Sequence, residues 1–413
     1  MSDTVRTPRH LPFFSELASL DESDASWRSV SAGLVVLRLV DAWIEEGAAA
    51  VAADGWGIRS VSAAIEEMPS GVPARAILTG IVDAVRTSAA SEMHSVAPRL
   101  MAYARSLDLD AKWSLAADVY ETVIAHAHPT EESDVVIGAH LRLAYCQRSL
   151  GALDDAAASY ATASAVASDM DDMFGILRAQ IGAAKIAMER GNMPRAELLL
   201  DDVISRVSAR SDLGDVHAMA LQDRAGCAFH RGSYDLGVQL AYESLARTRD
   251  PVDRDRLLGD IARAFTLLGI RSAARDAYLI VEATAQEQYV RWLASINLMD
   301  LAAQEGAMPV FERYRRTLSA LPFPPALRAK FLLQTAEGYQ ALLEPEAAVQ
   351  AGRRARAIAE EYGFHQVAFE AEALIGQVGQ GQRAAARVAD IPVPEPLQEI
   401  ARSINEMRRF VPG

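Results

Sequence analysis

The side chains most suited to chemistry in this sequence are its histidines and its adjacent aspartates. His126 and His128 stand closest among the eight histidines, and two imidazoles at this spacing can bind a metal ion. We expect polar surface roles instead, because the pair lies at the C-terminal end of a predicted helix, where imidazole interacts favourably with the helix dipole. Adjacent aspartates, which can act as metal ligands or acid catalysts, occur at Asp154-Asp155, Asp171-Asp172 and Asp201-Asp202. Their positions near helix ends or on exposed faces favour capping and solvation.

The sequence carries none of the common catalytic or cofactor-binding motifs. It has no Gly-rich phosphate loop, no HExxH, no paired CxxC, no GxSxG and no EF-hand loop. We therefore expect a protein that is not an enzyme and that holds no metal and no cofactor.

Composition and charge exclude several classes of partner. Half of the 413 residues are apolar, 23% are charged, and the formal net charge is −14. Binding to nucleic acid needs a concentrated basic face, and no helix-turn-helix with a basic recognition helix is present. The apolar run from Gly33 is interrupted by Arg38 and followed by Asp41, so we expect no membrane insertion. The first residues, with Asp3 and two early prolines, differ from a secretion signal, which predicts a cytoplasmic protein.

A helix-pair pattern repeats along the chain every 37 to 41 residues. Its anchor positions are Gly71, Ala111, Gly151, Gly191, Gly232, Gly269, Gly306, Leu343 and Gln380. Seven residues before each anchor stands an alanine, except at Met299, and five residues after it stands an alanine, except at Gly237 and Phe311. Small residues in both columns let two antiparallel helices approach closely. Glycine at the anchor suits the left-handed residue just beyond a helix C-terminus. The period predicts a stack of helix pairs.

This arrangement resembles the tetratricopeptide repeat (TPR) family. The best unit runs from Ile137 to about Ser168 and matches the family's large and small positions at Leu143, Ala144, Gly151, Ala156, Tyr160 and Ala163. A second match comprises Ala262, Gly269, Ala274 and Tyr278. The units here are longer than the family norm, lack its early tryptophan and rarely have its closing proline. The resemblance covers residues 57 to about 390. It implies an all-α fold, a right-handed α-α superhelix of about seven good repeats plus degenerate capping units.

The pattern divides the chain into four segments. A tail (1–24) precedes a capping helix and a degenerate helix pair (25–95), then TPR-like repeats (96–365), then a degenerate repeat, a Pro-rich link and a capping helix (366–413). The first capping helix is predicted over 25–53, with apolar residues at steps of three or four: Trp27, Val30, Leu34, Leu37, Val40, Ile44, Ala48 and Val51.

Prolines and cysteines add detail to this plan. Helices are predicted to begin at Pro98, Pro194, Pro251, Pro309, Pro325 and Pro345. Residues 391–396 should be extended, and residues 397–410 should form a last helix that caps the stack or docks elsewhere. Cys146 and Cys227 occupy equivalent positions two repeats apart, too far to bond, so we expect both to be small core residues.

The resemblance also selects candidate binding residues, because in this family the first helix of each pair lines the concave groove. In the repeats anchored at 111, 151 and 191, the corresponding positions carry five basic residues against Asp108 alone, with Tyr145 among them: Arg105, Arg142, Arg148, Arg178 and Lys185. In the repeats anchored at 232 to 343 they carry Arg256, Arg263 and Lys330 against Asp223, Asp260, Asp300 and Glu337. Gln222 and Asn297 are uncharged candidates.

We therefore predict a polarised groove that binds an acidic peptide, or one bearing a C-terminal carboxylate, by its anionic part. The alternative is that the arginines pair with neighbouring acids and stay solvated. The lysine and asparagine set of chaperone-binding members is not reproduced, so that partner is not carried over.

One repeat departs from both alanine columns. Met299 and Phe311 should either spread that helix pair and create a partner site near Tyr314, Arg315 and Arg316, or compensate one another in the core.

Two functions fit the sequence. The first is a non-catalytic scaffold or adaptor that binds a protein or peptide in its groove. The second is a ligand-sensing regulator similar to the peptide-controlled Rap-type proteins, in which an N-terminal helical segment acts on a signalling partner. The sequence leaves the oligomeric state open.

Overall fold

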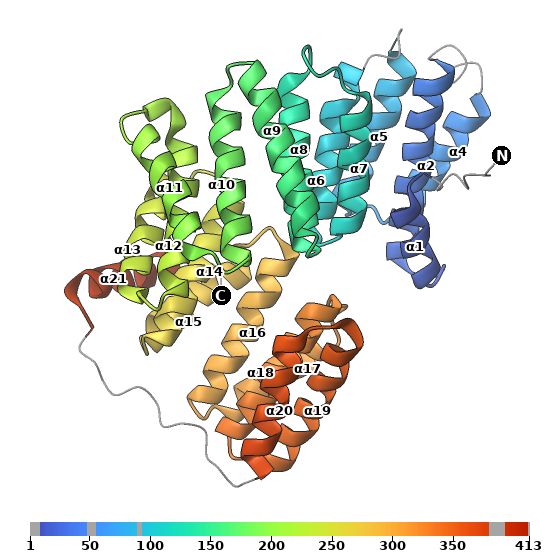
Figure 1. Ribbon diagram of the computed structural model, residues 1–413. Helices are drawn as coiled ribbons and strands as arrows, with labels where there is room; N and C mark the ends of the chain where they lie inside the picture. The colour runs from blue at the N-terminus through green and yellow to red at the C-terminus, as the bar shows by residue number, and fades with distance from the viewer. Residues whose placement is uncertain (1–8, 48–54, 89–92, 380–392, 412–413) are drawn as a thin grey trace, which may run out of the picture. The chain divides into compact units, whose positions relative to one another are not determined.

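A computed structural model describes residues 9–47, 55–88, 93–379 and 393–411 (Figure 1). These residues form α-helices and two short 3-10 helices, with no strand among them. The all-α prediction is therefore confirmed. The chain divides into two compact units, Met1–Val216 and His217–Gly413.

The first unit is a succession of antiparallel helices, each packed against the next from α6 to α11. Its α-helices are α1 (Leu11–Ser19), α2 (Ala25–Glu46), α4 (Gly55–Glu66), α5 (Pro73–Thr87), α6 (Ala97–Leu109), α7 (Trp113–His126), α8 (Ser133–Ser149), α9 (Leu153–Asp169), α10 (Met173–Glu189) and α11 (Met193–Val207).

The second unit continues the same pattern. The helix α12 (Gly214–His230) begins at the end of the first unit and leads into α13 (Tyr234–Arg247), α14 (Pro251–Leu267), α15 (Arg271–Thr284), α16 (Gln288–Gln304), α17 (Met308–Ser319), α18 (Pro325–Ala341), α19 (Pro345–Tyr362), α20 (His365–Gly379) and α21 (Glu395–Arg408). Each proline predicted to begin a helix lies in a first turn, because its missing N–H is not needed there.

The seven anchors from Ala111 to Leu343 are left-handed residues between paired helices, whereas the first anchor, Gly71, is not left-handed. The anchor glycines from Gly151 to Gly306 have φ between 74° and 83°, and Ala111 and Leu343 adopt φ of 59° and 63° despite their side chains. The two alanine columns are buried in these seven pairs, from α6–α7 to α18–α19. In the first and last repeats, anchored at 71 and 380, the pattern weakens, since Ala76 and Ala373 are exposed. The anchor Gln380 lies outside the described residues.

Close helix contacts in the stack depend on glycines that receive an aromatic ring. A Cβ added to Gly182 of α10 would lie 2.3 Å from a ring carbon of Tyr160 of α9. Tyr160 is itself only 7% exposed, so its ring has little room to move away.

Gly182→Ala should therefore lower the free energy of unfolding by ~1–3 kcal/mol through overpacking. Gly259→Ala is the matched control, because this helical glycine of α14 has no atom within 4 Å of an added Cβ, and alanine should stabilise the helix by ~0.5–1 kcal/mol. Urea unfolding followed by circular dichroism measures both. Equal stability of the Gly182 variant and the wild type would contradict this account of the packing.

A glycine next to an aromatic ring also explains the repeat with two large residues in its alanine columns. Met299 and Phe311 are both fully buried. An added Cβ at Gly338 of the next pair would lie 2.4 Å from Phe311, and Tyr339 packs edge-on against Phe311 at 5.1 Å between ring centroids. The larger side chains are thus accommodated in the core, where Gly338 makes room for Phe311.

The helices near the chain ends depart from the prediction in two ways. Residues 11–19 of the expected tail form α1, because Phe13 is buried against the helices that follow. The helix α2 ends at Glu46 instead of Ala53, since Gly47 adopts φ of 90°. Residues 48–54 lie outside the described part of the chain. Residues 391 and 392 of the predicted extended link also lie outside it. The last helix, α21, docks on α13 and α15.

Cys146 and Cys227 are both buried, as expected of small core residues, and belong to separate units. Among the described residues, every helix is too short or too polar to cross a bilayer.

Candidate binding surface

Five basic residues selected from the sequence lie on the first helices of three successive pairs in the first unit. These helices are α6, α8 and α10, and α8 contacts both of the others. We call the five residues the basic strip: Arg105, Arg142, Arg148, Arg178 and Lys185. All five are neither fully buried nor fully exposed, so each retains some contact with solvent.

Two arginines of the basic strip share one carboxylate. Arg105 donates to Oδ2 of Asp108 at 2.8 Å, and Nη1 of Arg142 lies 3.7 Å from the same oxygen. The Asp108 side chain has no exposed surface. One buried carboxylate thus holds two guanidinium groups.

Two further arginines of the basic strip, Arg148 and Arg178, contact an acid or an aromatic ring. Arg148 forms an ion pair with Glu189 of α10 and stands over the ring of Tyr145 at 5.4 Å. Arg178 stands over the ring of Phe174 at 5.4 Å. Some arginines of the strip therefore pair with neighbouring acids, as the alternative to ligand binding expected. The basic strip thus contains five cations, of which Arg105, Arg142 and Arg148 contact the carboxylates of Asp108 and Glu189.

In the second unit the selected positions on the first helices carry four acidic residues against three basic ones. Glu337 of α18 is an exposed residue, but its carboxylate is desolvated by the groups around it. This desolvation and the carboxylates of Asp300 and Glu370 raise the pKa of Glu337 to about 7, while Lys330 opposes the rise. The helices α16 and α18, which carry Asp300 and Glu337, pack against each other. The remaining predicted site residues lie on α12, α14 and α16: Gln222, Arg263 and Asn297. Arg263 is exposed, whereas Gln222 and Asn297 are half-buried.

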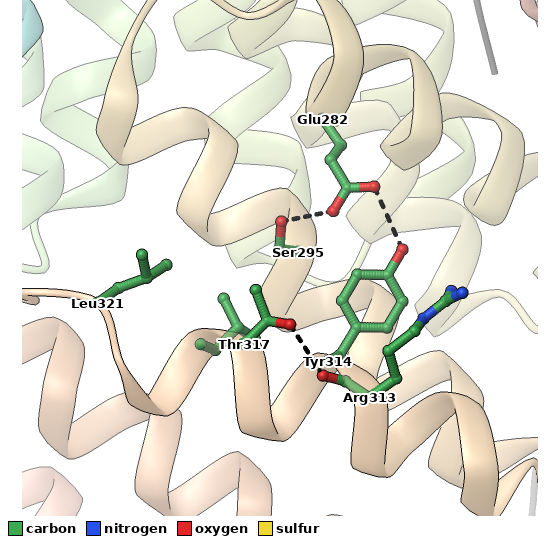
Figure 2. A pocket seen from close by; sticks show the side chains of 7 residues that line it. Glu282, Ser295, Arg313, Tyr314, Thr317 and Leu321 are labelled. Atoms are coloured by element: carbon green, nitrogen blue, oxygen red, sulfur yellow. Dashed lines mark hydrogen bonds between the residues drawn. The ribbon is translucent and has the colours of Figure 1, made fainter.

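A pocket of about 310 Å³ opens between α15, α16 and α17. Glu282 accepts hydrogen bonds from Ser295 at 2.6 Å and from Tyr314 at 3.2 Å (Figure 2). Burial and this carboxylate raise the pKa of Tyr314 to about 12, so the phenol stays protonated as a donor. Leu318 and Leu321 supply apolar wall, and Arg313 stacks over the Tyr314 ring at 5.4 Å. The pocket lies in the repeat that the sequence marks as atypical.

A buried histidine that sequence reasoning missed lies near the N-terminus. His10 is 5% exposed and adopts a left-handed backbone. Its Nδ1 is 2.6 Å from Asp118 of α7, and its Nε2 is 3.1 Å from Asp41 of α2. With a carboxylate on each nitrogen, the imidazole has no lone pair for a metal or a proton-transfer step. The signal available in the sequence was Asp41, a charge that directly follows the apolar run of the predicted first capping helix.

His126 lies in the last turn of α7, as predicted. His128 accepts a backbone hydrogen bond from Glu131 at 3.3 Å. Among the described residues, no group of three or more His, Cys, Asp or Glu side chains could hold a metal ion.

Comparison with solved structures identifies proteins with a similar fold. No family model and no curated protein sequence matches the chain. Among solved structures, NprR in complex with its cognate peptide NprX is similar, at TM-score 0.51 and 13% identity over 84% of this chain and 91% of that one. The Rap conjugation gene regulator of plasmid pLS20 in complex with the Phr* peptide has TM-score 0.46 and 9% identity, over 87% and 99%. A Rap protein complexed with Competence and Sporulation Factor has TM-score 0.45 and 9% identity, over 86% and 98%.

The fold is therefore that of a TPR-like helical solenoid, as the repeat pattern predicts.

Proposed function

We propose that this chain is a non-catalytic scaffold or adaptor that binds a peptide, or an extended segment of a protein, along the first helices of its repeats. The observation that carries the proposal is the basic strip on α6, α8 and α10, in which Arg105 and Arg142 share the carboxylate of Asp108. The similarity of the fold to NprR, whose structure contains a bound peptide, supports this choice of ligand.

The strip favours an acidic segment or a terminal carboxylate as the part of the ligand that it binds. A guanidinium group has five N–H donors in a planar fork, so Arg142 can donate hydrogen bonds to a carboxylate of a ligand while it still contacts Asp108. Tyr145 on the same face, half-buried beside Arg148, offers a ring for an apolar side chain of the ligand. Charge-assisted bonds of this kind are stronger than neutral ones, and they should weaken as salt rises.

A second candidate function is a peptide-sensing regulator similar to the Rap-type proteins. The similarity to NprR over most of both chains favours it. In this version the peptide bound at the strip changes the affinity of the N-terminal helices for a signalling partner. Peptide binding alone does not separate the two functions; a partner whose affinity changes when the peptide is present would select the regulator.

Peptide display tests the proposal directly. Two random libraries, one with free C-termini and one with internal segments, are selected on the full chain and counter-selected on Arg142→Glu/Arg148→Glu/Lys185→Glu. We expect enrichment of peptides with Asp, Glu or an essential terminal carboxylate. Selection of only apolar or basic peptides, or of none, would refute the acidic-ligand proposal.

A further inference from the structure

The pocket between α15, α16 and α17 is lined by residues that depart from the repeat. Ser295 of α16 stands eleven residues before the anchor Gly306. A serine has much less volume than a leucine and brings a hydroxyl group in place of apolar surface. At this point α16 therefore leaves space that a leucine fills in other first helices. The equivalent positions before four other anchors carry buried leucines: Leu100, Leu221, Leu258 and Leu332.

Glu282 departs from the repeat in a similar way on the neighbouring helix α15. It stands thirteen residues after the anchor Gly269. In three other repeats the equivalent residue is apolar and at least half-buried, namely Ile124, Ile204 and Leu245. The two departures meet, because Ser295 donates its hydrogen bond to Glu282 at 2.6 Å. The pocket and its carboxylate are thus a local feature of this part of the array.

Within the described ranges, the hydrogen-bond partners of Glu282 are neutral hydroxyl groups, those of Ser295 and Tyr314. Arg313 also lines the pocket, but its guanidinium group stacks over the Tyr314 ring at 5.4 Å and the residue is exposed. Figure 2 shows the Arg313 side chain beside this ring and Glu282 pointing toward the phenol oxygen. Each carboxylate oxygen has two lone pairs, so Glu282 can accept further hydrogen bonds from a ligand.

We propose that the pocket binds a protonated amine with a short alkyl chain, whose ammonium group donates hydrogen bonds to Glu282 and whose carbon chain lies against Leu318 and Leu321. Leu318 is buried and Leu321 is half-buried, and both line the pocket. Hydrogen bonds between an ammonium and a carboxylate are stronger than those between neutral groups. An anion would be repelled by Glu282. The volume of about 310 Å³ is at the lower end of the range for small-ligand sites, ~300–1,000 Å³.

The test compares three probes that share one alkyl chain and differ in the charge of the head group: pentylammonium, pentan-1-ol and pentanoate. Each is titrated into the full chain and followed by ligand-observed NMR. Pentylammonium should bind with a Kd on the order of millimolar, as suits so small a ligand. The alcohol and the carboxylate should bind at least about ten-fold more weakly, because neither makes a charge-assisted bond to Glu282.

Variants of the lining separate charge from shape. Glu282→Gln keeps the size of the side chain and should weaken pentylammonium binding by at least about ten-fold. Glu372→Gln is the matched control, because it removes the same charge from an exposed position on α20, and binding should not change. Thr317→Phe should also abolish binding by filling the pocket. Thr317 is exposed and its hydroxyl group bonds to the backbone oxygen of Arg313, so the fold should tolerate the larger residue.

Two further measurements give the source and the sign of the ligand. Nα-acetyl-lysine N-methylamide presents the same kind of ammonium on a peptide side chain. Tighter binding of this probe than of pentylammonium would identify a lysine side chain as the source, and weaker binding would identify a free amine; either result supports the site. Arg313→Ala removes a nearby positive charge and should leave amine binding unchanged or tighten it by up to about five-fold.

The inference would be overturned by a preference for pentanoate, by a loss of amine binding in Arg313→Ala, or by equal binding to the wild type, Glu282→Gln and Thr317→Phe. The proposed function is tested separately. The charge reversals in the basic strip lie in the other unit and should leave amine binding unchanged, whereas Glu282→Gln should leave binding of an acidic peptide to the strip unchanged.

Discussion

His10→Ala should lower the free energy of unfolding of the first unit by ~3–5 kcal/mol, the usual cost of removing one partner from a buried ion pair. His10 joins α2 to α7 through Asp41 and Asp118, whose side chains are only 14% and 13% exposed. Without the imidazolium, these two half-buried carboxylates lose the positive charge that offsets their repulsion. Urea unfolding of the full chain, followed by circular dichroism at pH 7, measures the change.

The effect should depend on pH in a defined direction. Burial alone would lower the pKa of His10, but the hydrogen bonds and charges of Asp118 and Asp41 outweigh it and raise the pKa from 6.5 to about 9. A raised folded-state pKa means that the protonated form stabilises the fold. The contribution, ~3 kcal/mol for a rise of this size, is complete below pH 6.5 and is lost as pH rises through about 9.

Comparison of variants isolates this contribution. Wild type should lose stability relative to His10→Ala between pH 6.5 and about 9.5, so the difference between them should shrink across this window. His365→Ala is the control, because His365 is exposed at the start of α20, and its loss should change stability by less than ~0.5 kcal/mol. A difference between wild type and His10→Ala that stays constant over this range would show that His10 is not held as an imidazolium.

The second large effect concerns ligand binding. Arg142→Glu/Arg148→Glu/Lys185→Glu should weaken binding of a display-selected acidic peptide by at least about 100-fold, which corresponds to ~1 kcal/mol for each reversed charge. Arg142 and Arg148 also contact Asp108 and Glu189, so some loss of stability should accompany the change. Fluorescence anisotropy at 25 °C, well below the unfolding transition of the variant, separates the two effects.

A matched set of reversals controls for net charge. Arg86, Arg195 and Arg206 are exposed and lie on the second helices α5 and α11. Their replacement by glutamate changes the net charge of the chain by the same amount as the strip variant. Binding should persist in this control with only a small loss. Equal weakening in both triple variants would mean that overall charge, and not the basic strip, governs affinity.

The sequence predicts the repeat because its determinants are local. An anchor in the left-handed conformation and small residues in two columns are required wherever two helices cross closely, and the anchors from Ala111 to Leu343 meet that requirement in the structure. Phe311 breaks the small-residue column, and Gly338 in the next pair makes room for its ring. These features can be found by aligning the chain with itself.

Long-range pairings were not predictable in the same way. The partners of His10 are 31 and 108 residues away, and the docking of α21 joins positions as distant as Asp276 and Asn405. Neither contact follows from the repeat. For the basic strip, the helix positions came from the resemblance, whereas the sharing of Asp108 by two arginines depends on side-chain geometry that spacing alone does not give.

Photocrosslinking is the most direct test of the central claim that ligands bind on the first helices. A selected acidic peptide carrying a photoreactive residue is irradiated with the full chain, and the adducts are mapped by mass spectrometry. The account predicts adducts on α6, α8 and α10, including the neighbourhood of Tyr145, that disappear in the Arg142/Arg148/Lys185 reversal. Adducts confined to second helices such as α7, α9, α11 or α13 would contradict it.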